Sequence, residues 1–224
     1  MILKTIKSVL GILLLPVVFA VASSFYEQFG FIDINFTKGQ IYFLWGVTAY
    51  CLFQLILIKP VYLYVLGHET VHVLATWLCL GRVTRFHVTS RGGSVSTTKT
   101  NIFIKLSPYF IPIYAILITA AYFFIIKMFL WGFLVRPYYM FLFGATLSFH
   151  IIMTIDTIKV KQPDFAKAGH IMSLVLIFVI NMIIIAGILG LFFNSFSFLS
   201  FLRSSYYSSV DLYRTIFIRL FQYK

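Results

Sequence analysis

Long apolar stretches alternate with short polar ones along most of the chain, a pattern that is typical of membrane helices. A helix needs about 20 consecutive apolar residues to cross the hydrocarbon core of a bilayer. The stretches that predict helices occupy residues 9–22, 41–58, 61–80, 102–127, 138–158 and 170–193. The pattern therefore predicts an all-α polytopic membrane protein with about five to six transmembrane helices.

The first apolar stretch has two interpretations. Lys4 and Lys7 precede it, and Ala20-Val21-Ala22 resembles the small-residue cleavage site of a secretory signal. Residues 1–22 are then either a cleaved signal peptide or a retained transmembrane helix. We favour the retained helix, because multi-span proteins commonly begin with one.

Residues 81–101 differ from the rest of the chain and predict a short β-hairpin after the helix at 61–80. β-Branched residues dominate residues 83–88 and 95–98, and residues 90–94, which include Gly92 and Gly93, predict the turn. Open strands cannot face lipid, so we expect the hairpin on the protein, in a water-filled cavity or at the interface.

The pattern also predicts three regions along the chain. Residues 1–60 hold N-terminal transmembrane segments, and residues 61–193 form the core. Residues 194–224 are aromatic and basic, with apolar side chains at helical spacing. This tail predicts an amphipathic helix that lies on the membrane surface.

Composition supports the membrane class and excludes others. The chain of 224 residues is 61% hydrophobic and only 11% charged, with a formal net charge of +12. Its basic residues fall between apolar spans, where they meet anionic lipid headgroups, so we expect a lipid bilayer and no nucleic acid as partner. Cys51 and Cys79 both lie in apolar segments and predict neither a disulfide framework nor a thiolate metal site.

The helix at 61–80 carries the chemistry. His68 and His72 are four residues apart, so they project from one helix face and can hold one zinc ion. Glu69 lies beside that position, where it can take a proton from zinc-bound water. The chain has only two Glu and five His, and ionisable residues inside a membrane usually serve a function. The sequence therefore predicts a Zn²⁺ site.

A catalytic zinc site usually has three protein ligands, and the residues leave the third one open. At about 1.5 Å per helical residue, His72 and His150 lie at similar depths, roughly 12–13 Å from one face of the membrane. Asp156 lies shallower. Asp164 follows Pro163 in the polar loop at 159–169 and reaches the zinc only if this loop folds back between helices. Asp164, His150 and Asp156 are all acceptable ligands, and His150 can also act beside the metal without binding it.

These features together resemble the site-two protease family of intramembrane zinc metallopeptidases. The resemblance rests on residues 68–72 in an apolar helix, on the Gly92-Gly93 hairpin, and on Pro163-Asp164 with Gly169 before a further span. It covers residues 61–193 loosely, and it departs from the family where Pro163-Asp164 continues into Phe165 instead of Gly. The resemblance implies that Asp164 is the third ligand, that the substrate is a membrane protein, and that the location is a bacterial inner membrane.

The predicted activity is a zinc-dependent intramembrane metalloendopeptidase, with zinc-bound water activated by Glu69. A free edge of the hairpin at Gly92 and Gly93 is then expected to pair with an unwound substrate strand. Asn181 is more simply a hydrogen bonder between helices, with substrate binding as its alternative role. For His87 and His170, at segment ends, we expect an interfacial position only.

The alternative function is a zinc-binding membrane protein without proteolysis, such as a transporter, a sensor or an inactive protease scaffold. A transporter is expected to carry polar residues at successive depths of several spans. Here the polar residues gather around one site, which favours the protease. Positive charge in the loops at 81–101 and 159–169 favours a cytoplasmic location for both, but the basic tail opposes that orientation. The sequence leaves the oligomeric state open.

Overall fold

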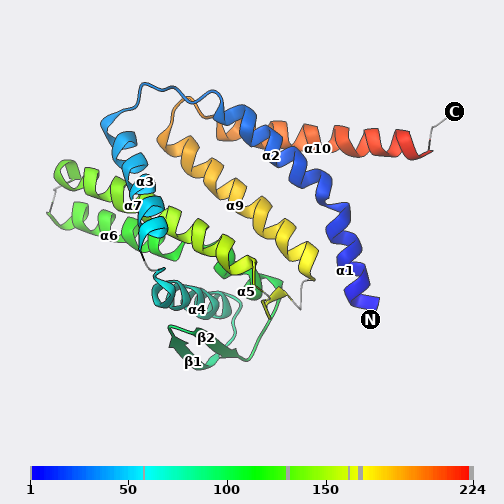
Figure 1. The fold of residues 1–224 in the computed structure, drawn as a ribbon, viewed down its shortest axis with the longest axis horizontal. Helices are drawn as coiled ribbons and strands as arrows, with labels where there is room; N and C mark the ends of the chain where they lie inside the picture. The colour runs from blue at the N-terminus through cyan, green and yellow to red at the C-terminus, as the bar shows by residue number, and fades with distance from the viewer. Residues whose placement is uncertain (1, 58, 130–131, 161, 166–168, 222–224) are drawn as a thin grey trace. The chain divides into compact units, whose positions relative to one another are not determined.

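The structure is a computed structural model that describes residues 2–57, 59–129, 132–160, 162–165 and 169–221. Nearly all of its regular structure is helical (Figure 1). The chain forms two compact units, a central unit of Asn35–Asp164 and a terminal unit of Met1–Ile34 with Phe165–Lys224. The predicted division of the chain at residues 60 and 193 stays a prediction.

Two long helices, α3 (Lys38–Ile56) and α7 (Gly132–Ile158), pack against each other in the central unit (Figure 1). Thr37 begins α3 with a capping box, in which its side chain accepts from the Gln40 backbone N–H and the Gln40 side chain accepts from the Thr37 backbone N–H. A third helix, α6 (Ile113–Phe129), packs along α7. The zinc-motif helix of the sequence analysis is α4 (Val61–Leu78).

The predicted span at 102–127 is broken near Pro108 and Pro112. It begins as α5 (Ile102–Leu106) and the 3₁₀ turn η1 (Ser107–Tyr109), and α6 follows at an angle of 74° to them. Pro108 and Pro112 cannot donate backbone hydrogen bonds, so a continuous helix cannot form there. The break leaves α5 and η1 packed against α4.

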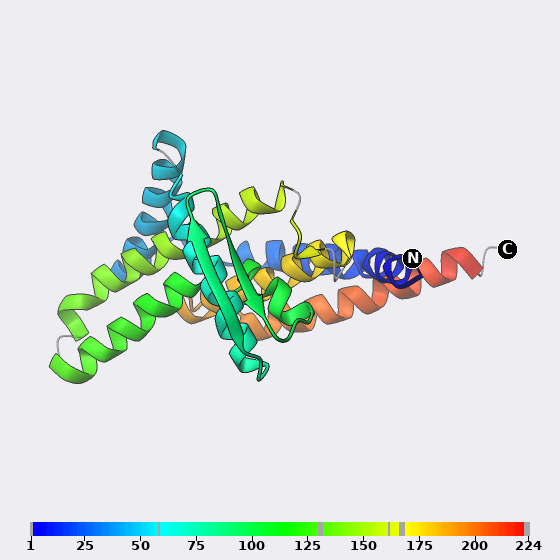
Figure 2. The ribbon, with the colours of Figure 1, turned by 90° about the horizontal axis from the view of Figure 1, so that it is seen from below.

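The predicted hairpin is present, and its turn is shorter than the predicted turn at 90–94. Strands β1 (Val83–Thr89) and β2 (Gly92–Thr97) pair antiparallel, and both pack against α4 (Figure 2). The turn consists of Ser90 and Arg91, and Gly92 and Gly93 are the first residues of β2. The Thr89 hydroxyl accepts from the Arg91 backbone N–H and donates to the Gly92 carbonyl, which closes the turn before the glycines.

The terminal unit contains α1 (Ile2–Leu13), α2 (Leu15–Phe29), α9 (His170–Phe192) and α10 (Phe198–Phe221). Helix α9 packs against α1, α2 and α10, and α10 also lies along α2 (Figure 1). The predicted tail is thus helical over most of its length. Its location on a membrane surface stays a prediction.

Among the described residues, four helical stretches are long and apolar enough to cross a membrane: Ile6–Phe29, Lys38–Ile56, Leu134–Ile158 and His170–Phe192. The bent pair of Ile102–Tyr109 with Ile113–Phe129 makes a fifth if it counts as one span. This confirms the predicted class in its coarse form, a mostly helical fold with a small hairpin, and it is compatible with a multi-pass membrane protein. Helix α4 does not qualify, and it is also the helix that carries His68, Glu69 and His72.

Candidate metal centre

Helix α4 places the motif residues against the rest of the central unit. Glu69 and His72 are each 7% exposed, and the His68 side chain is 10% exposed. Gly67 allows the Tyr114 ring to lie close, since a Cβ there would be 2.7 Å from its Cε2 atom. The Tyr114 hydroxyl in turn donates to the Leu63 carbonyl at 2.6 Å. Packing thus fixes the helix on the side that faces α6.

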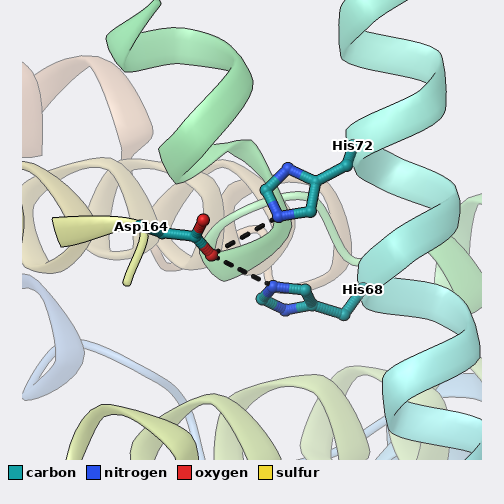
Figure 3. A group of neighbouring side chains, drawn as sticks. All are labelled: His68, His72 and Asp164. Carbon is teal, nitrogen blue, oxygen red and sulfur yellow. Dashed lines mark ion pairs between the residues drawn. The ribbon is translucent and has the colours of Figure 1, made fainter. Parts of the chain in front are cut away.

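Asp164 lies opposite the two histidines, although it is 92 residues beyond His72 in the chain (164 minus 72). Its Oδ2 atom is 3.6 Å from His68 Nε2 and 3.4 Å from His72 Nε2 (Figure 3). One donor atom from each of the three residues lies within 4.8 Å of the others. The loop after α7 therefore folds back to α4, as the sequence required for Asp164 to reach the histidines.

The distances from Asp164 to the two histidines fit a tetrahedral metal ion. Both N–O distances exceed the range of about 2.7–3.2 Å for an N–H···O hydrogen bond. Ligands about 2.0–2.1 Å from zinc in a tetrahedron are about 3.3 Å apart, which is close to both distances. Two imidazole nitrogens and one carboxylate oxygen are also a common ligand set of catalytic zinc. The residues present therefore fit the predicted ion.

Further contacts orient these side chains. His72 Nδ1 lies 2.7 Å from the Ile104 carbonyl oxygen. A carbonyl only accepts, so Nδ1 carries the proton and Nε2 of the neutral ring presents its lone pair. Lys105 Nζ donates to Asp164 Oδ1 at 2.9 Å, and the Tyr109 hydroxyl donates to Oδ2 at 3.1 Å. Burial raises the pKa of the Asp164 carboxyl, and the hydrogen bond from Lys105 opposes burial and helps to hold that pKa below its usual range.

The three candidate ligands and Glu69 line one cavity of about 570 Å³ in the central unit. Residues of β2 form part of its wall, and Lys59, Arg91 and Gln162 add polar groups. Glu69 lies under β2 at Gly93, where a Cβ would be 2.8 Å from its Oε1 atom. The cavity thus places a buried carboxylate beside the candidate metal position, together with room for water and a peptide segment.

The two other candidate ligands lie elsewhere. His150 is buried on α7 and lines a small space shared with Gly67, His68 and Val71. Asp156 accepts from Lys59, from Lys159 at 3.1 Å and from Gln54. Neither belongs to a possible metal-binding group among the described residues, so Asp164 is the candidate that the structure brings to the histidines.

Of the other residues singled out from the sequence, the two hairpin glycines, Gly92 and Gly93, line the cavity of the candidate metal site. Asn181 lies in the terminal unit and donates to the Ile177 carbonyl of its own helix, so its predicted role in substrate binding stays a prediction. His87 on β1 and His170 at the start of α9 are exposed. Sequence reasoning missed Lys105 and Tyr109; a lysine inside the apolar stretch 102–127 was the available signal, since charges within spans find partners.

Comparison of the chain with protein-family models, curated proteins and solved structures finds no match. The resemblance to site-two proteases therefore stays a prediction based on the residues named above.

Proposed function

We propose that this chain is an intramembrane zinc metalloendopeptidase that hydrolyses peptide bonds of membrane-embedded substrates. The observation that carries the proposal is the group of His68, His72 and Asp164 in the same cavity as Glu69. A histidine pair alone supports metal binding. A third ligand together with a neighbouring buried carboxylate supports hydrolysis.

In this proposal, His68 and His72 would hold the zinc ion through Nε2, and Asp164 would hold it through Oδ2. Bound zinc would supply a Lewis acid that polarises the scissile carbonyl and lowers the pKa of water. Glu69 accepts the proton of the attacking water and returns it to the leaving nitrogen. Its place in the cavity wall gives its carboxylate access to a substrate without opening it to bulk solvent.

The proposed setting is a lipid bilayer crossed by about five to six helices, as the apolar patterning predicts. Water would reach the zinc through the cavity, whose lining includes the polar side chains of Lys59, Arg91 and Gln162. The substrate is a membrane protein. Its helix must unwind before cleavage, because the backbone hydrogen bonds of a helix shield its peptide groups from attack. The free edge of the hairpin offers backbone groups to such an unwound strand. The resemblance favours a bacterial inner membrane.

The test compares wild-type protein with Glu69→Gln, which keeps the shape of the side chain but removes its basicity. Both are reconstituted in liposomes with a panel of fluorophore–quencher transmembrane peptides, and their zinc content is measured. We expect both proteins to contain zinc and only the wild type to cleave. Cleavage by Glu69→Gln at the wild-type rate would contradict the mechanism.

The alternative is a zinc transporter, sensor or inactive scaffold. Within the described residues there is one possible metal-binding group, whereas a transporter needs several along its path. Zinc bound by the wild type without cleavage of any peptide, and zinc flux into the liposomes, would favour the transporter.

A further inference from the structure

The short segment Ile102–Tyr109, formed by α5 and η1, contacts two of the three candidate ligands. The Ile104 carbonyl accepts from His72 Nδ1, and Lys105 and Tyr109 both donate to Asp164. His68 is different, because its buried Nδ1 makes no hydrogen bond within the described part of the chain. One segment of eight residues (102 through 109) therefore orients a ligand from α4 and a ligand from the loop after α7.

The local fold makes this segment a rigid support. The Asn101 side chain accepts from the Ile104 backbone N–H at 2.7 Å and fixes the first turn of α5. Ile104 and Leu106 are each 2% exposed, and Tyr109 is fully buried. The helix cannot continue through Pro108, so η1 turns Tyr109 back toward Asp164. Lys105 extends from this support along the cavity wall.

The contacts divide the two oxygens of Asp164 between different partners. Lys105 donates a hydrogen bond to Oδ1, whereas Oδ2 faces both histidines and accepts a hydrogen bond from Tyr109. A carboxylate with two free oxygens can bind a metal through both and so occupy two coordination positions. With Oδ1 held by an ammonium, Asp164 offers Oδ2 alone, which leaves a position for water.

We propose that Ile102–Tyr109 is the positioning element of the metal site, with Lys105 as the residue that restricts Asp164 to one ligand oxygen. The inference rests on the proposed metal site and adds to it residues that hold the ligands without binding the ion. Partners of this kind typically change metal affinity about 10- to 100-fold when they are removed.

Lys105 has two opposite effects on a metal ion, and their balance is measurable. Its charge repels a dication, so loss of the charge alone would tighten binding. Its hydrogen bond orients Asp164, so loss of the bond weakens binding. If Lys105 is a positioning residue, the loss of its hydrogen bond has a larger effect on metal affinity than the loss of its charge. Weaker metal binding after removal of Lys105 therefore supports the positioning role, and tighter binding contradicts it.

The experiment titrates Co²⁺ into the full-length, metal-free protein in detergent and follows the visible absorption of the bound ion. The variants are Lys105→Met, Lys105→Arg and Tyr109→Phe. Lys127→Met is the matched control, since Lys127 is an exposed lysine in the last turn of α6. We expect Lys105→Met to bind Co²⁺ about 10- to 100-fold more weakly, with an altered spectrum. Lys105→Arg should bind Co²⁺ nearly as tightly as the wild type, and Tyr109→Phe should lose less affinity than Lys105→Met. The control should bind Co²⁺ like the wild type.

Wild-type or tighter affinity in Lys105→Met would overturn the inference. If Lys105→Met does not fold, Tyr109→Phe tests the inference, because this substitution removes a single oxygen atom. Wild-type cobalt affinity and spectrum in Tyr109→Phe would also overturn the inference. A wild-type protein that binds no cobalt overturns the metal site itself. A wild-type protein that binds cobalt or zinc but cleaves nothing contradicts only the protease activity.

Discussion

The backbone of Gly93 in β2 lies directly against the side chain of Glu69 in α4. A Cβ added at Gly93 would stand 2.5 Å from Glu69 Cγ and 2.8 Å from its Oε1 atom. Real side chains do not approach so closely, so no larger residue fits at this point of the strand unless Glu69 moves. The hairpin therefore restricts where the proposed general base can lie.

Gly93→Ala is expected to displace the Glu69 carboxylate while leaving His68, His72 and Asp164 in place. A displacement of about 1 Å in a catalytic group can lower the rate on the order of a hundredfold, so we expect a loss of that order in peptide cleavage with zinc still bound. The control is Gly39→Ala in α3, whose added Cβ would meet only the flexible end of Met140 at 3.8 Å. Cleavage by Gly93→Ala at the rate of Gly39→Ala would show that the contact is unimportant.

The identity of the third ligand is decided by the zinc content of single variants. Asp164→Ala removes an oxygen that lies within 3.6 Å of both imidazole Nε2 atoms, so we expect loss of stoichiometric zinc. His150→Ala is the comparison, because His150 is equally buried but lies outside the metal-binding group. It should retain zinc. The reverse pattern, with zinc lost only from His150→Ala, would reassign the ligand and remove the geometric basis of the proposal.

Much of the fold followed from local rules. The apolar stretches depend on nearby residues and predicted helices that the structure contains, and the two histidines four residues apart, His68 and His72, lie on one of them. The hairpin position was also predictable from its β-branched residues. Its turn was predicted too long: a Gly-Gly pair is typical of turns, but here Gly93 lies in β2 against Glu69, and Gly92, with a positive φ of 146°, is the first residue of that strand.

The candidate site was harder to predict, because it depends on where side chains lie around the helices. Depth in the membrane says how far a residue lies from one face but not where it lies around its helix. By depth alone, His150 matched His72. In the structure, His150 shares a small space with His68 on α4, but the Nε2 atoms of His68 and His72 face Asp164. Neither the rotation of α7 nor the fold of its following loop follows from apolar spacing. Lys105 was missed for the same reason, since its partner is 59 residues away.

Asp156 is expected to contribute a little to stability and nothing to metal binding. It pairs with Lys59 and Lys159, whose side chains are 51% and 67% exposed, and exposed pairs contribute about 0–1 kcal/mol each. Asp156→Asn should therefore keep its zinc and lower the free energy of unfolding by no more than about 1–2 kcal/mol for the two pairs. Zinc analysis and thermal unfolding in detergent measure both quantities. Loss of zinc would show that Asp156 acts at the metal after all.

Two glycines set the contact between α3 and α7, which supports the helix that leads to Asp164. A Cβ at Gly46 would stand 1.9 Å from the Phe141 carbonyl oxygen, and one at Gly144 would stand 2.2 Å from that of Phe43. Small residues of this kind let two backbones approach closely in membrane proteins. The obstacles are backbone atoms, which cannot turn aside as a side chain can.

Gly46→Ala and Gly144→Ala are therefore each expected to separate the helices and to destabilise the protein by about 1–3 kcal/mol or more. Gly39→Ala again serves as the control, since it makes the same change in the same helix as Gly46 without a close contact. Thermal unfolding of the three variants in one detergent, followed by circular dichroism, measures the difference. If all three unfold at the same temperature, α3 and α7 do not pack through these glycines.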